Sequence, residues 1–271
     1  MTAVEGTFGD LPVGYEPVPH QVAGHMYKDG KHGMLRRSGG SEKQLYKPVQ
    51  SPPKGQREVD FYAAINQSGD AEPVWSEFRK WMARFYGTTR LPDQLQYIAL
   101  EDLVSPYDNP SVIDIKVGQR CWDNFASDEK IRSEREKYPP QAKIGYRIGG
   151  IRRFVADDQT SVKRSKTHCL TLDEQGVKDA LKEFFSGCKD GLEDVIKQLQ
   201  MLSSLFEKQT SVHFFSSSLL IIFGTSDAQQ PPACVRMIDF AHAYMLSEDE
   251  ASVDDNYLFG LRNLVKTLSE L

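Results

Sequence analysis

The sequence has no long apolar segment. Its longest apolar run, Leu219–Phe223, has the length of one strand, whereas a helix that crosses a bilayer needs about 20 apolar residues. We therefore expect no transmembrane segment. The first residues include Glu5 and Asp10 and lack the apolar core of a signal peptide. These absences favour an intracellular protein, in the cytoplasm, the nucleus or both.

Cysteine is scarce, and positive charge is in deficit. The four cysteines are widely spaced and form no C-x-x-C pair, so we expect neither a disulfide framework nor a structural zinc site. The formal net charge of −5 argues against a nucleic-acid partner. The sequence also has no internal repeat or low-complexity tract. We expect the protein to be a monomer.

One part of the chain reverses this charge balance. Residues 116–166 hold 13 Lys and Arg against 7 Asp and Glu, although the chain as a whole is acidic. Basic clusters without a ligand are common on protein surfaces. A basic island within an acidic protein nevertheless indicates a specific anionic ligand.

Hydrophobic periodicity predicts an α+β protein. Helices are expected over residues 58–64, 75–85, 127–137, 171–184, 192–206 and 257–268, and strands over 44–49, 97–100, 112–117, 144–155, 219–223 and 235–238. Residues 1–20 predict an irregular arm, and the glycine-rich residues 30–41 a flexible loop or hairpin. Composition changes near residue 104, where we place the boundary between a small lobe (1–104) and a large lobe (105–271).

The segment Pro110–Gly118 (PSVIDIKVG) carries the strongest chemical signal. Side chains alternate between the two faces of a strand, so Asp114 and Lys116 share one face. The β-branched residues around them predict a buried strand. An acid and a base held at the edge of a core form either a structural ion pair, which is the commoner case, or part of an active site.

Three segments in this order resemble the signature of the inositol polyphosphate kinases: PSVIDIKVG, SSSLL at Ser216–Leu220 and MIDFAH at Met237–His242. The likeness runs from Val18 to Leu268 and is greatest to the multikinase subfamily, through HQVAGH at 20–25 and KPVQSPPKGQREVDFY at 47–62. It implies a two-lobed kinase-like fold, with an antiparallel sheet in the small lobe and a short helical inositol-phosphate-binding insertion in the large lobe. It also implies phosphoryl transfer with ATP and magnesium (Mg2+) as cofactors.

The resemblance also assigns the nucleotide side of the site. It implies that Lys47 contacts the nucleotide phosphates and that Glu58 supports this lysine. The backbone of Glu101 and Leu103, in the IALEDL segment, would hydrogen-bond adenine. Asp114 would accept hydrogen bonds from the ribose hydroxyls.

The same likeness assigns the metal and the transfer step. Asp239 would be the magnesium ligand, with Ser218 as a second candidate, because this hard ion needs few protein oxygens when phosphates and water supply the rest. Lys116 would bridge the transferring phosphoryl group and the acceptor hydroxyl. His242 would face the acceptor.

The acceptor side is expected on the helix that begins near Ser127. Lys130, Ser133, Glu134 and Lys137 have the spacing of one helix face. The resemblance implies that Lys130 and Lys137 contact substrate phosphates, whereas Ser133 and Glu134 replace two family glutamines. Arg152 matches a further substrate-binding arginine of the family.

The implied acceptors are inositol polyphosphates: the trisphosphate and the tetrakisphosphate, converted to tetrakis- and pentakisphosphates. The short acceptor region predicts an open site with room for a phosphoinositide lipid headgroup. Two alternatives stay open. The chain could be an inositol hexakisphosphate kinase, which HQVAGH and KYPP argue against but Ser133 and Glu134 allow, or a non-catalytic scaffold, which Lys47, Lys116 and Asp239 argue against.

Overall fold

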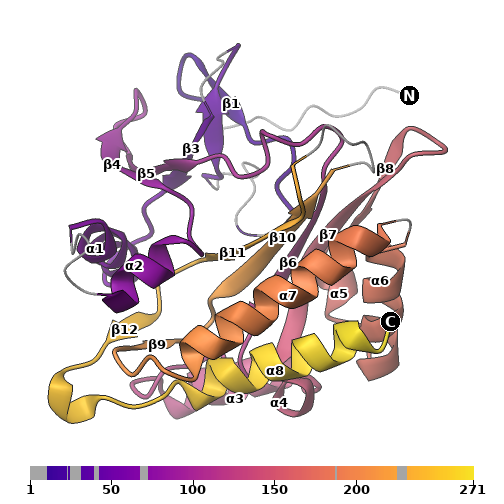
Figure 1. Ribbon diagram of the computed structural model, residues 1–271. Coiled ribbons are helices and arrows are strands. Elements are labelled where there is room, and N and C mark those ends of the chain that lie inside the picture. Colours follow the sequence, from indigo (N-terminus) through magenta and orange to yellow (C-terminus); the bar gives the residue numbers. More distant parts are fainter. Residues whose placement is uncertain are drawn as a thin grey trace.

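Two antiparallel five-stranded sheets organise the molecule (Figure 1). The computed structural model describes residues 11–22, 24, 32–39, 43–67, 73–186, 188–224 and 231–271. The smaller sheet has the strand order β1 (Tyr15–Pro17), β2 (Leu35–Arg37), β3 (Gln44–Pro48), β5 (Gln96–Glu101) and β4 (Phe85–Arg90). The larger sheet has the order β11 (Cys234–Ile238), β10 (Ser218–Phe223), β6 (Ser111–Val117), β7 (Tyr146–Val155) and β8 (Thr160–Arg164).

Helices cover these sheets. Beside the smaller sheet lie α1 (Lys54–Gln67) and α2 (Pro73–Arg79). The larger sheet is accompanied by α3 (Asp128–Lys137), α4 (Gln141–Ile144), α5 (Lys166–Cys169), α6 (Glu174–Phe184), α7 (Lys189–Phe206) and α8 (Asp255–Ser269). In Figure 1, α7 and α8 run side by side in front of this sheet. A two-stranded sheet of β9 (Val212–Phe214) and β12 (Ala243–Met245) and the 3-10 turn η1 (Glu248–Glu250) complete the described elements.

One hydrophobic core joins the helices of the smaller sheet to the rest of the chain. The ring of Phe61 on α1 meets that of Phe214 at right angles, with centroids 5.5 Å apart. Phe78 on α2 contacts Phe206 on α7 in the same way at 5.7 Å. The predicted lobe boundary at residue 104 lies in the link between β5 and β6 and stays a prediction.

The α+β class is confirmed, but two local predictions are wrong. The helix expected over 75–85 ends at Arg79, and Phe85 belongs to β4. The spacing of these residues reflects their burial and not one continuous helix. They lie on two different elements, and Trp81 and Met82 are buried in the link between them. Helix α6 begins after Asp173, whose carboxylate accepts from the amide of Gly176 at 2.8 Å, and not at Thr171.

The N-terminal region also has more order than expected. The part of the predicted irregular arm that the structure describes contains β1, which pairs with β2 inside the predicted loop 30–41. His25 and the ends of that loop lie outside the described residues. The helix predicted to begin near Ser127 is confirmed: the Ser127 hydroxyl caps α3 by accepting from the amide of Lys130 at 3.3 Å.

Candidate active site

Strand β6 is the centre of the site. It lies between β10 and β7, with its β-branched residues at 1% exposure or less. Asp114 lies opposite Leu220 on β10, and Lys116 lies opposite Ser218. The predicted buried strand, with an acid and a base two residues apart, is therefore confirmed.

A bulge opposite Asp114 makes room for its carboxylate. The pairing of β6 with β7 shifts register between Asp114 and Ile115, so Gly149 is the extra residue. A Cβ atom at Gly149 would lie 2.7 Å from Oδ1 of Asp114, and one at Gly150 would lie 2.1 Å from the carbonyl oxygen of Val22. Only glycine fits at these two positions while Asp114 and the backbone of Val22 keep their places.

Asp114 is buried at 5% exposure. Burial raises its pKa, and the negative charge of Asp239 raises it further, although Lys116 and a hydrogen bond with Ser218 oppose the shift. The result is a pKa of about 6. Asp114 therefore carries a poorly solvated charge at neutral pH, which makes it a strong acceptor for hydroxyl groups.

Lys116 is held on the other side of Ser218. Its ammonium group donates to the backbone carbonyl of Ser216 and lies 3.4 Å from the Ser218 hydroxyl. Ser216 has a left-handed backbone with φ of 59°, and its own hydroxyl donates to the carbonyl of Cys121 at 2.9 Å. The S-S-S run thus forms a turn that aims a carbonyl oxygen at the lysine.

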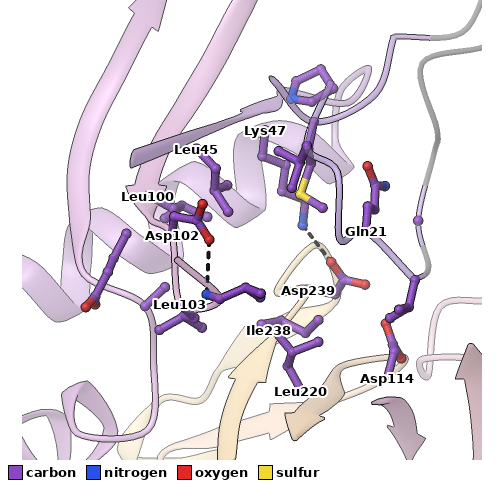
Figure 2. Close-up of a pocket in the computed structure, with 18 of the residues that line it drawn as sticks. Gln21, Leu45, Lys47, Leu100, Asp102, Leu103, Asp114, Leu220, Ile238 and Asp239 are labelled. Atoms are coloured by element: carbon purple, nitrogen blue, oxygen red, sulfur yellow. Dashed lines mark hydrogen bonds and ion pairs between the residues drawn. The ribbon is translucent and has the colours of Figure 1, made fainter. Parts of the chain in front are cut away.

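Lys47 links the two sheets. Its Nζ lies 2.7 Å from Oε1 of Glu58 on α1. It also lies 2.7 Å from Oδ1 of Asp239, which follows β11 (Figure 2). Burial opposes the charge on Lys47, but the two carboxylates outweigh it and raise its pKa. Glu58 also accepts from the amide of Phe240 at 3.0 Å. Glu58 therefore supports Lys47 as the resemblance implies.

Asp239 occupies an unusual backbone position. Its φ is 66°, a left-handed conformation that is uncommon outside glycine and concentrated at functional sites. The hydroxyl of Ser217 holds this turn by donating to the Asp239 carbonyl at 2.7 Å. The side chain is 39% exposed and borders a cavity of about 580 Å³.

The cavity lies between the smaller sheet and residues of β6, β10 and β11. Its lining includes Lys47, Asp114 and Asp239 on the polar side and the link after β5 on the other (Figure 2). In that link the amide of Glu101 donates to the carbonyl of Arg84 at 2.9 Å. Asp102 turns inward and caps the amides of Val104 and Ser105. Glu101, Asp102 and Leu103 line the cavity, and their contact with a base stays a prediction.

The donor set suits a hard cation bound mainly by its ligand. Across the described ranges, no cluster of three or more His, Cys, Asp and Glu side chains could hold a metal alone. Asp239 supplies one accessible carboxylate, which fits Mg2+ or a similar ion that arrives with phosphate and water ligands. Ser218 is fully buried and contacts both Lys116 and Asp114, so its role as a metal ligand stays a prediction.

Helix α3, where the substrate lysines are expected, turns one carboxylate inward. Oε1 of Glu134 lies 2.6 Å from Nζ of Lys130 and 2.7 Å from Nζ of Lys137. Burial raises the pKa of Glu134, but the two hydrogen bonds outweigh it and lower this pKa to about 2. Arg147 on β7 lies behind the pair, with Nη2 3.6 Å from Oε2 of Glu134. Ser133 is exposed.

The remaining predicted substrate residues have separate surroundings. Arg152 lies opposite Val112, and its guanidinium donates to the carbonyl of Pro110. Nδ1 of His242 lies 3.0 Å from Oδ2 of Asp123, which also accepts from the Tyr244 hydroxyl. Burial lowers the pKa of His242 against the opposing effect of Asp123.

Three residues of the site were missed from the sequence. Asp123 lies 119 positions from His242, so no local spacing links them. Arg147 and Lys166 belong to the basic island, but only the fold brings them to Lys116. Arg147 is its register partner, and Lys166 is close enough that the charges of Lys137, Arg147 and Lys116 add to the effect of burial and lower its pKa.

The sheet arrangement and the cation–carboxylate cluster across the cavity define a two-lobed kinase-like protein. The sequence profile of the family described as inositol polyphosphate kinase matches residues 97–269. The chain therefore belongs to the inositol polyphosphate kinase family.

Individual relatives agree with the resemblance seen in the sequence. The human inositol polyphosphate multikinase is 33% identical over 217 residues, which cover 78% of this chain and 51% of the relative. The chain thus spans about half the length of that protein. A solved inositol phosphate multikinase structure matches with a TM-score of 0.67 and 26% identity, covering 79% of this chain and 98% of its own.

A second solved structure supports the fold. It is an inositol phosphate multikinase from S. cerevisiae in complex with ADP and Mn2+, with a TM-score of 0.68 and 22% identity. The match covers 84% of this chain and 99% of that chain.

None of the helices that the structure describes has the length and apolar character of a membrane span.

Proposed function

We propose that this chain is an ATP- and magnesium-dependent kinase that phosphorylates inositol trisphosphate and tetrakisphosphate to tetrakis- and pentakisphosphates. One observation carries the proposal. A buried cation, Lys47, and an accessible carboxylate, Asp239, meet in a cavity that also receives Asp114 and borders the strand of Lys116.

The nucleotide is proposed to enter the 580 Å³ cavity. Adenine would meet the backbone of Glu101 and Leu103, and the ribose hydroxyls would donate to Asp114. Lys47 would hold the phosphates. Its ion pair with Glu58 would keep it charged when Asp239 binds the metal. The bound ADP of the yeast multikinase structure supports a nucleotide at this kind of site.

The metal site would be Asp239. When bound, the metal would neutralise charge on the phosphates and bring them in line for transfer. The left-handed backbone of Asp239 and its 39% exposure keep its carboxylate at the cavity wall. The Mn2+ in the yeast structure supports a divalent ion in this family.

The acceptor is proposed to lie over Lys116. Charge builds up on the transferring group in a loose transition state, and a positioned cation in a dry site stabilises it. Arg147 and Lys166 lie close to this lysine, and Lys130 and Lys137 lie close to them around Glu134. Such a cluster suits an acceptor with several phosphates. His242, oriented by Asp123, would contact the same molecule.

Four further features stay predictions: Arg152 as a substrate ligand, a lipid headgroup as acceptor, the monomeric state and the intracellular location.

To test this function, the purified protein is incubated with Mg2+, ATP and either inositol 1,4,5-trisphosphate or inositol hexakisphosphate. The products are then resolved by the ring position of each phosphate. Stepwise conversion of the trisphosphate to tetrakis- and pentakisphosphate is expected. A pyrophosphate formed only from the hexakisphosphate would assign the chain to the hexakisphosphate kinases instead. Lack of turnover of both, with nucleotide bound, would favour the non-catalytic scaffold. Lys116→Ala is the matched control for contaminating kinases.

A further inference from the structure

The carboxylate of Glu134 lies between Lys130 and Lys137, where the proposed function would put an acceptor phosphate. Both Lys130 and Lys137 donate to the same oxygen, Oε1, at 2.6 and 2.7 Å. The two ammonium groups are therefore close enough for one phosphate group to bridge them. An acceptor phosphate and Glu134 cannot both hold these two lysines at full strength, so they compete.

Glu134 cannot leave the lysines without a new partner. Its side chain is 5% exposed, and a buried carboxylate that loses its counter-ion is strongly destabilising. The surrounding charge is otherwise favourable, because four cations, Lys130, Lys137, Arg147 and Lys166, lie close to Glu134.

The guanidinium group of Arg147 is placed to become the new hydrogen-bond partner of Glu134. Among the described residues, Nη1 of Arg147 and Oε2 of Glu134 are buried atoms without a hydrogen-bond partner. Nη2 lies 3.6 Å from Oε2, which is within ion-pair range but too long for a hydrogen bond. A displacement of less than about 1 Å would bring the two groups to hydrogen-bond distance. A buried pair that stops short of bonding requires an explanation.

We propose that Arg147 is a positioning residue that takes over Glu134 when an acceptor phosphate displaces this carboxylate from Lys130 and Lys137. The inference rests on the proposed function, because it takes an inositol polyphosphate as the ligand. The exchange makes acceptor binding depend on phosphate charge. A phosphate with two negative charges outcompetes the single charge of the carboxylate, whereas a singly charged anion does not.

Acceptor binding without nucleotide tests this exchange. Calorimetry with inositol 1,4,5-trisphosphate compares the wild type, Arg147→Met, Glu134→Gln and the double variant. We expect Arg147→Met to weaken binding about tenfold or more, because Glu134 then stays on the lysines. With Gln at position 134 the same arginine change should alter affinity less than about twofold. Nucleotide affinity, measured in parallel, should be equal in all four proteins.

Each other outcome has a definite meaning. An equal loss from Arg147→Met in both backgrounds would make Arg147 a direct phosphate ligand and overturn the exchange. Lower melting temperature with unchanged affinity would make Arg147 merely structural. If the arginine variant does not fold, a structure of the wild type with bound trisphosphate decides. Glu134 must then be hydrogen-bonded to Arg147, and a carboxylate still on both lysines overturns the inference. Failure of the wild type to bind the trisphosphate would overturn the proposed function as well.

Discussion

Replacing Asp114 with asparagine should make the nucleotide-free protein more stable at neutral pH. Asp114 is 5% exposed, and burial raises its pKa from an ordinary 3.8 to about 6. An acid whose pKa is higher in the folded state binds more protons there than in the unfolded chain, so its ionisation opposes folding. Asparagine keeps the shape and a hydrogen-bonding oxygen but carries no charge.

The pKa difference sets the size of the effect. The interval from 3.8 to about 6 corresponds to about 3 kcal/mol at 1.36 kcal/mol per pH unit. The contribution of Asp114 to the free energy of unfolding falls as pH rises from about 4 to about 6 and is constant above that. Asp114→Asn should therefore gain up to about 3 kcal/mol at pH 7, and this advantage should vanish near pH 4.

Urea denaturation of both proteins in chelator, without nucleotide, measures this difference at each pH. Asp123→Asn is the matched control. Burial opposes its ionisation, but hydrogen bonds from Tyr244, His242 and the amide of Phe125 prevail and lower its pKa, so this variant should lose stability at pH 7. An Asp114→Asn protein that is no more stable than wild type at pH 7 would refute the reasoning. Under the proposed function the stabilised variant should also bind ATP more weakly.

Three further predictions concern the same site. Lys116→Ala should lower kcat by about 10²–10³ or more while nucleotide still binds, because the lost cation acts on the transferring group; near-normal turnover with unchanged binding would contradict its role. Lys47→Met should destabilise the protein by about 3–5 kcal/mol in denaturation experiments, because Glu58 is 1% exposed and would lose its counter-ion; Glu58→Gln in the same background should recover part of the loss. Gly149→Ala should raise the KM for ATP more than it changes that for the acceptor, since its Cβ would lie 2.7 Å from the Asp114 carboxylate; an equal rise in both would indicate general damage to the sheet.

Much of the centre of the site follows from local rules. The period of two along β6 is enough to put Asp114 and Lys116 on one face, and the structure has them there beside Ser218. A serine before an acidic first turn is enough to predict the start of α3 at Ser127. These predictions hold because each depends only on residues a few positions apart.

The rest depends on contacts that no local pattern encodes. Helical spacing put Ser133 and Glu134 on one face with the lysines, but it could not tell that only Glu134 would be buried among them. The partner of His242 is Asp123, in a loop with no periodicity to mark it. The helix expected over 75–85 failed for a related reason, because burial in the core follows the tertiary contacts of Trp81 and Met82 and not their helix propensity.

The ion pair between Lys47 and Asp239 joins positions 192 residues apart in the chain. Contacts of such long range form slowly, because a long loop of chain must be closed at a cost in entropy before the two residues meet. A partly folded molecule with only one sheet has one half of this pair and cannot hold a phosphate–metal complex. A ligand that needs both residues binds the completed native state alone. It therefore shifts the folding equilibrium toward the native state by mass action. The fraction of molecules that are unfolded then falls as the ligand concentration rises.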